Sequence, residues 1–196
     1  MTSRPQPLDT APPELQPIME MAKASMGFLP NSFMTMARKP ELLQALMPMM
    51  GYLVGPQLSI GAELRQMVAY MASYGAGCRY CQAHTSHGAE KNGASAEKIA
   101  ELWRFQDSDL FDEAERAALA FALASGQVPN AVEEGHYAAL REHYSEDQII
   151  DLAAVVSIFG FLNRWNDTMG TPLEETPIEF ANSRLAESGW QIDKHG

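Results

Sequence analysis

The spacing of apolar residues is the feature that most constrains the fold of this 196-residue chain. Leu64, Met67, Val68, Met71 and Ala72 recur at i, i+3, i+4, i+7 and i+8, the stripe of an amphipathic helix. Alternating β-branched residues and hairpin turn sequences are not found. The pattern predicts an all-α, multi-helical fold, with helices at about 12–26, 31–38, 41–54, 60–75, 79–92, 95–105, 112–125, 130–143 and 146–160 and shorter pieces beyond.

Glycines and prolines divide the chain and indicate where helices stop and start. Four prolines among the first 15 residues predict an extended N-terminal arm over 1–11. We expect one domain over 12–175, with a core at 59–93 that carries both cysteines, and a C-terminal helix or tail at 176–196. The expected helix stops are Gly27, Gly51, Gly93, Gly126 and Gly170.

The charge of the chain excludes some classes of partner. Its formal net charge is −11, whereas nucleic-acid and anionic-membrane binding require clustered Lys and Arg. No apolar run approaches the roughly 20 residues of a membrane span, and no signal-peptide pattern is visible at the start. We therefore expect a cytoplasmic protein that binds neither nucleic acid nor membrane.

The two cysteines, Cys78 and Cys81, lie together in the segment GAGCRYCQAHTSHG at 75–88. A disulfide across so short a loop constrains the unfolded chain little, and in a reducing cytosol paired cysteines are usually catalytic, redox-sensing or metal-binding. Two glycines precede the pair, which predicts that the cysteines open a new helix. There the backbone N–H groups favour a thiolate. One thiol could then attack a substrate while the other resolves the product as a disulfide.

His84 follows Cys81 by three residues, close to one helical turn, so its ring can lie beside that sulfur. An imidazole there could act as a general base or hold a thiolate as a cation, although a structural histidine is the alternative. His87 points elsewhere and is expected at the surface.

The series Cys78, Cys81, His84 and His87 also has ligand types that suit zinc. On one continuous helix these side chains spread over about 13 Å of axis, so a single ion cannot gather all four. We therefore expect no bound metal or cofactor. A partial site with both cysteines and one histidine, and a pair of merely buried small thiols, stay open as alternatives.

A faint internal repeat appears at an offset of 85 residues, between 59–88 and 144–173. A helix, a glycine break and a second helix match in both segments, which suggests a duplicated helix pair. In the second copy the cysteines are replaced by asparagines, so that copy is expected to be architectural, with side chains that make caps and buried polar contacts. These side chains are Asn163, Arg164 and Asp167.

The segment at 60–92 resembles the carboxymuconolactone decarboxylase-like family, on its alkylhydroperoxidase-D side. Further segments at 26–46, 112–124 and 145–170 resemble its peroxidase-related members. The resemblance implies an all-α fold that assembles as dimers, trimers or hexamers. It also implies a CxxC pair that works with a histidine and a glutamate in a proton relay and is recharged by an external lipoyl or thioredoxin-like thiol reductant. Cys81 then resembles the attacking thiol and Cys78 the resolving one.

The chain departs from the family pattern at two positions. Gln66 stands twelve residues before the first cysteine, where the relay glutamate is usual, and an amide cannot carry a proton at neutral pH. Glu63, one turn earlier, could substitute or could simply be solvated. Thr85 stands where the family often has its histidine, which leaves His84 as the candidate. The candidate catalytic residues are therefore Cys78, Cys81, His84 and Gln66.

We expect a homo-oligomeric thiol oxidoreductase that reduces small-molecule organic hydroperoxides or disulfides with electrons from a reductant protein. A redox sensor or scaffold with little turnover is a second hypothesis, which the glutamine at position 66 favours. A third is a lyase in the manner of the decarboxylases, whose activity would survive thiol alkylation.

Overall fold

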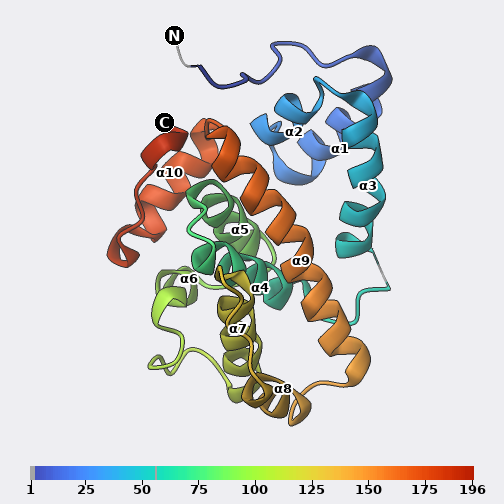
Figure 1. Ribbon diagram of the computed structural model, residues 1–196. Helices are drawn as coiled ribbons and strands as arrows, with labels where there is room; N and C mark the ends of the chain where they lie inside the picture. Colours follow the sequence, from blue (N-terminus) through green and yellow to red (C-terminus); the bar gives the residue numbers. More distant parts are fainter. Residues whose placement is uncertain (1–2, 56) are drawn as a thin grey trace.

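A computed structural model describes residues 3–55 and 57–196 of the protein. Within those residues the chain is helical and contains no strand, which confirms the predicted all-α fold (Figure 1). The α-helices are α1 (Gln16–Met26), α2 (Asn31–Met36), α3 (Pro40–Val54), α4 (Ala62–Gly75), α5 (Arg79–Lys91), α6 (Ala96–Ala100), α7 (Glu113–Gly126), α8 (Glu134–Arg141), α9 (Glu146–Met169) and α10 (Glu175–Arg184). Short 3₁₀ helices are η1 (Pro13–Leu15), η2 (Leu102–Arg104), η3 (Ala186–Ser188) and η4 (Asp193–His195).

Helix α4 forms the core of the fold, where it packs against α5, α7 and α9. Every residue from Met67 to Ser73 is buried, so α4 is covered on all sides rather than along one stripe. Two glycines let α4 and α7 approach closely. A Cβ at Gly75 would lie 2.5 Å from the carbonyl oxygen of Leu123, and a Cβ at Gly126 would meet the backbone of Ala72. This contact fixes the C-terminal end of α4, from which the cysteine segment departs.

Helix α9 corrects two expectations. It runs unbroken from Glu146 to Met169, so Gly160 does not end a helix, and the second copy of the proposed repeat is one helix rather than a pair. A glycine inside a helix costs about 1 kcal/mol, which the packing of α9 against α4, α5 and α7 offsets. Gly51 likewise lies inside α3 and is not a stop, whereas Gly170 does end α9 with a left-handed φ of 55°.

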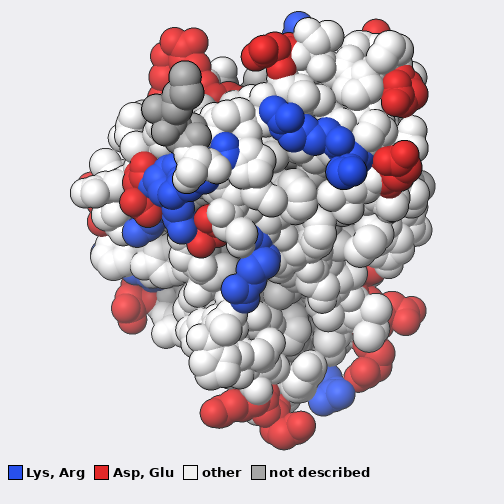
Figure 2. All heavy atoms as spheres, turned by 45° about the horizontal axis from the view of Figure 1, so that its top comes forward, with Lys and Arg blue, Asp and Glu red and all other residues white. Residues whose placement is uncertain are grey.

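By length and composition alone, α9 is apolar enough to cross a membrane. In the fold it packs against α3, α4, α5, α7 and α8 and buries the polar side chains of Asp151, Asn163 and Asn166. These are the contacts of a core helix. Figure 2 shows one face of the molecule, on which Lys and Arg side chains stand in separate groups rather than as one continuous basic surface.

The C-terminal segment folds back onto α5 (Figure 1). The indole N–H of Trp190 donates to the carbonyl oxygen of Arg79 at 3.1 Å, and the N–H of Leu173 donates to the carbonyl oxygen of His195 at 2.8 Å. Residues after Gly170 therefore lie beside the helix that carries the cysteines.

Candidate active site

The cysteines sit at the start of α5, as predicted. After α4 the chain turns at Gly77, whose φ of 74° suits glycine, and the N–H of Cys78 donates to the carbonyl oxygen of Ser73 at 3.0 Å. Cys78 is the N-cap of α5, and Cys81 lies in its first turn. Both are free thiols, and both are buried. The pair is therefore held beneath the surface at a helix N-terminus.

The two thiols differ in electrostatics. The Cys81 thiol as a hydrogen-bond partner, helped by backbone N–H groups, lowers the pKa of Cys78 even though burial opposes this. Burial raises the pKa of Cys81, and the neighbouring Cys78 raises it further. Burial therefore disfavours a thiolate at Cys81, so a base must remove its proton before this sulfur can attack.

Asn166, on α9, contacts the second thiol directly. Its Nδ2 donates to Cys81 Sγ at 3.4 Å, while its buried Oδ1 has no hydrogen-bond partner. The contact favours the thiolate of Cys81 against the effect of burial. We expected the second copy of the repeat to be architectural, with buried polar contacts. Asn166 makes such a contact, and its partner is the Cys81 thiol. Asp167, one residue on, forms an ion pair with Lys194 at 2.9 Å.

His84 belongs to a buried polar network that the sequence did not reveal. Its Nε2 lies 2.7 Å from Oε2 of Glu174, and both side chains are about nine-tenths buried. The other carboxylate oxygen, Oε1, accepts hydrogen bonds from the hydroxyl of Tyr80 at 2.8 Å and from the N–H of Asn31 at 2.5 Å. The Tyr80 ring also stacks on His84 with ring centroids 4.3 Å apart. The network thus joins the helix that carries His84 to the start of α2 and to the N-cap of α10.

Burial would raise the pKa of Glu174, but its contacts with His84, Asn31 and Tyr80 outweigh burial and lower that pKa. The carboxylate is therefore ionised at neutral pH and can orient the imidazole. Glu174 was missed because it follows Cys81 by more than ninety residues. Its one local signal, a place at the N-cap of α10, does not point toward His84.

The other candidates for the proton relay make different contacts. Gln66 lines the same cavity as Cys81 and His84 but lies against Gly88, where a Cβ would come 2.7 Å from its Oε1. Glu63 is paired with Lys98 at 3.2 Å, so it is neither a relay group nor simply solvated. The hydroxyl of Thr85 donates to the carbonyl oxygen of Cys81 at 2.7 Å. The carboxylate beside the histidine therefore comes from the C-terminal segment rather than from α4.

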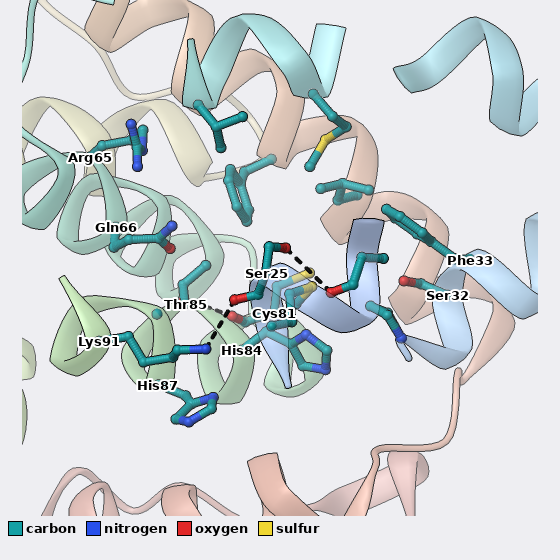
Figure 3. Close-up of a pocket in the computed structure, with 18 of the residues that line it drawn as sticks. Ser25, Ser32, Phe33, Arg65, Gln66, Cys81, His84, Thr85, His87 and Lys91 are labelled. Atoms are coloured by element: carbon teal, nitrogen blue, oxygen red, sulfur yellow. Dashed lines mark hydrogen bonds between the residues drawn. The ribbon is translucent and has the colours of Figure 1, made fainter. Parts of the chain in front are cut away.

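A cavity of about 380 Å³ opens beside Cys81 (Figure 3). Cys81, His84 and Asn166 line it, whereas Cys78 does not. Much of its wall is apolar and comes from α1, α3 and α9 as well as α2. The apolar lining includes Met21, Phe33, Met47, Met50, Val54 and Phe159. Its size and lining suit a small organic molecule.

Among residues 3–55 and 57–196, no group of three or more His, Cys, Asp or Glu side chains is placed to hold a metal ion. His84 is directed to Glu174, and His87 lies between the rings of Phe28 and Phe180. The two histidines therefore do not converge with the cysteines on one point.

Comparison of the sequence with known proteins shows the family of this chain. The model of the carboxymuconolactone decarboxylase family matches residues 40–124, which include both cysteines and His84. The uncharacterized protein YdfG of Bacillus subtilis (strain 168) is 31% identical over 133 residues, which are 67% of this chain and 88% of that protein. The chain belongs to the carboxymuconolactone decarboxylase family.

Solved structures of related proteins agree with this family assignment. The debrominase Bmp8 without ligand is 36% identical with a TM-score of 0.85, and the match covers 93% of this chain and 98% of that one. A cysteine-to-alanine variant of Bmp8 was solved in complex with 2,3,4-tribromopyrrole. The alkylhydroperoxidase AhpD core of a peroxidase-related protein from Ralstonia eutropha JMP134 is 23% identical over 94% of this chain and 98% of that one. Its TM-score of 0.77 shows the shared fold.

Proposed function

We propose that this family member is a thiol-dependent oxidoreductase that reduces a small organic hydroperoxide in the cavity beside Cys81. One observation carries the proposal. Cys81 lines a largely apolar cavity, while the second thiol stands one turn away and behind it. A small organic peroxide or small disulfide fits a cavity of about 380 Å³.

The proposed reaction has two steps, reduction of the peroxide by Cys81 and formation of a disulfide with Cys78. The Cys81 thiolate attacks the outer oxygen of R–O–O–H, the O–O bond breaks, and the alkoxide takes a proton to leave as an alcohol. Sulfur gives up two electrons and becomes a sulfenic acid. The Cys78 sulfur then attacks the Cys81 sulfur and expels hydroxide, which leaves as water, and a Cys78–Cys81 disulfide forms. An external dithiol returns two electrons and two protons to the pair.

The polar network supports proton movement in these steps. Cys81 must lose its proton before attack, and the leaving alkoxide must gain one. With Nε2–H directed to Glu174, the imidazole of His84 presents Nδ1 as the acceptor. Asn166 stabilises the charge on Cys81 while its proton is away. We assign His84 the role of general base and acid, with Glu174 as its positioning residue.

The external reductant is proposed to be a lipoyl or thioredoxin-like dithiol, as the family resemblance implies. We retain the proposals of a cytoplasmic, homo-oligomeric protein, since a reducing compartment keeps such a dithiol reduced between turnovers.

The test is steady-state consumption of cumene hydroperoxide with dihydrolipoamide as reductant. We expect turnover by the wild type, background rate for Cys81→Ser, and one equivalent of peroxide consumed by Cys78→Ser before activity stops. Equal turnover by Cys81→Ser and wild type would overturn the proposal. Disulfide formation in the wild type without multiple turnovers would instead favour the redox sensor.

A second candidate function is reductive debromination, which the 35% identity to the debrominase Bmp8 bound to 2,3,4-tribromopyrrole favours. The same dithiol would supply two electrons, so that C–Br and two thiols give C–H, bromide, a proton and a disulfide. Release of bromide from 2,3,4-tribromopyrrole, measured by ion chromatography, tests it. Debromination that exceeds peroxide reduction in kcat/KM would make it the leading function.

A further inference from the structure

The cavity beside Cys81 is positively charged at its other end. Arg65 of α4 and Lys91 of α5 line it there, together with Gln66 (Figure 3). No Asp or Glu belongs to the lining drawn from the described part of the chain. This is unexpected in a chain with 25 acidic and 14 basic residues. Cations without carboxylates in a cavity are the usual environment of a bound anion.

Arg65 forms no ion pair with a carboxylate in the part of the chain that the structure describes. Its Nε is buried without a hydrogen-bond partner, and burial lowers its pKa with no carboxylate acting against this. Glu63, two residues before Arg65 in the sequence, forms an ion pair with Lys98, which also pairs with Glu115. A half-buried cation without a counter-ion is destabilising unless a ligand supplies the charge.

Lys91 is held over the same end of the cavity. Its Nζ donates to the carbonyl oxygen of Ser25 at 2.9 Å, and this bond bridges α5 to the last turn of α1 (Figure 3). A carbonyl oxygen is neutral, so the ammonium charge remains available to a second partner. Arg65 and Lys91 therefore approach one end of the cavity from two helices.

The cations stand away from the thiol along the same cavity, much of whose lining is apolar. Lys91 follows Cys81 by ten residues on one straight helix, which corresponds to about 15 Å of axis. Gly88 lies between them on the lining face, where its missing side chain leaves room for Gln66. Met47, Met50 and Val54 of α3 add apolar side chains to the lining of the same cavity. The cavity thus presents a reactive sulfur, an apolar wall and a positive end.

We propose that the cavity binds an amphipathic carboxylate whose anionic group is held by Arg65 and Lys91 while its apolar chain extends toward Cys81. Resting on the proposed function, this makes the substrate class a medium-chain organic hydroperoxide that bears a carboxylate. Arg65 forms a bidentate pair with the carboxylate, and Lys91 adds a point charge.

Binding is tested without turnover in the Cys81→Ser variant, with decanoate as probe and 1-decanol as its neutral counterpart, by isothermal titration calorimetry. We expect decanoate to bind at least tenfold more tightly than decanol, which corresponds to about 1.4 kcal/mol. Arg65→Gln should remove that preference, and Lys91→Gln should reduce it several-fold. Arg164→Gln, which removes an exposed arginine that does not line this cavity, should leave it unchanged. Equal affinity for the acid and the alcohol would overturn the proposal, as would equal effects of Arg65→Gln and Arg164→Gln.

Turnover then separates this proposal from the reductase. The substrates are 10-hydroperoxydecanoate and its methyl ester, with dihydrolipoamide as reductant and wild-type enzyme. We expect a higher kcat/KM for the acid than for the ester, because the acid has the lower KM. In Arg65→Gln this difference between acid and ester should disappear. Equal kcat/KM for acid and ester would overturn the carboxylate site and keep the reductase. Arg65-dependent decanoate binding without reduction of either substrate would overturn the reductase and keep the site.

Discussion

The two ends of α5 hold polar side chains in opposite conditions. At its N-terminal end, Cys81 and His84 lie in a buried network where Asn166 and Glu174 supply partners. At its C-terminal end, Lys91 is exposed, and its charge is unmatched by a carboxylate in the cavity. Satisfied buried polar groups rigidify a site, whereas unsatisfied charge invites a ligand. In our proposals α5 therefore carries the catalytic side chains and a ligand-binding side chain about three turns apart.

Glu174→Gln is expected to have the largest effect on the N-terminal end. The amide keeps hydrogen bonds to Tyr80 and Asn31 but cannot stabilise a protonated His84, so kcat for peroxide should fall roughly 10- to 100-fold. The pH profile of kcat should change as well, which a merely structural role would not cause. Glu175→Gln, at the exposed neighbouring position, is the matched control and should behave as wild type. A full rate in Glu174→Gln would show that the network does not position the base.

Asn166→Leu should have the next largest effect. Loss of the Nδ2 donor leaves the Cys81 thiolate without that hydrogen bond, so alkylation of Cys81 by iodoacetamide at pH 8 should slow about tenfold. Asn163→Leu is the control, because neither polar atom of that buried side chain has a partner. Equal alkylation rates in wild type and Asn166→Leu would remove Asn166 from the site.

Gln66→Glu tests both ends of α5, through kcat at the N-terminal end and decanoate binding at the C-terminal end. If the usual family position were needed for the relay, restoring the glutamate would raise turnover. We expect no gain in kcat because Glu174 already holds His84. We also expect decanoate to bind a few-fold more weakly, because a carboxylate would then line the cavity along with Arg65. A several-fold rise in kcat would contradict the assignment of Glu174.

Acid unfolding should show the smallest effect. The pKa of Glu174 is lower in the folded protein than its ordinary value of 4.5, so the unfolded chain binds more protons there as the pH falls. Its contribution to stability is present above about pH 4.5 and is lost as pH falls through the folded pKa. The difference in free energy of unfolding between wild type and Glu174→Gln should shrink from pH 6 to pH 3, as measured by urea titration. A difference independent of pH would contradict the ionised carboxylate.

Much of the fold followed from local patterns. Helical spacing, together with the glycines and prolines that divide the chain, placed most helices within a few residues. Gly160 misled because tertiary packing decides whether an interior glycine ends a helix. The start of α5 at the cysteines was also predicted, since Gly77 and the CxxC spacing are local features.

The partners of the site could not be predicted in the same way. Glu174 and Asn166 reach His84 and Cys81 across ninety and eighty-five residues, and only the packing of the C-terminal segment and α9 onto α5 brings them together. The pKa order of the thiols depends on burial, which a motif does not encode. A binding role for Arg65 could not be predicted from the sequence, because a single arginine on a helix is not a motif. Only the fold shows that the residues lining the cavity with it include no carboxylate.

The identity of the attacking sulfur tests the central claim most directly. Cys78→Ser and Cys81→Ser are each treated with one equivalent of cumene hydroperoxide in the presence of dimedone, and the sulfenic-acid adduct is located by mass spectrometry. We predict a stoichiometric adduct on Cys81 in Cys78→Ser and none in Cys81→Ser, because Cys81 lines the cavity and Cys78 does not. An adduct on Cys78 in Cys81→Ser, formed as fast, would contradict the account.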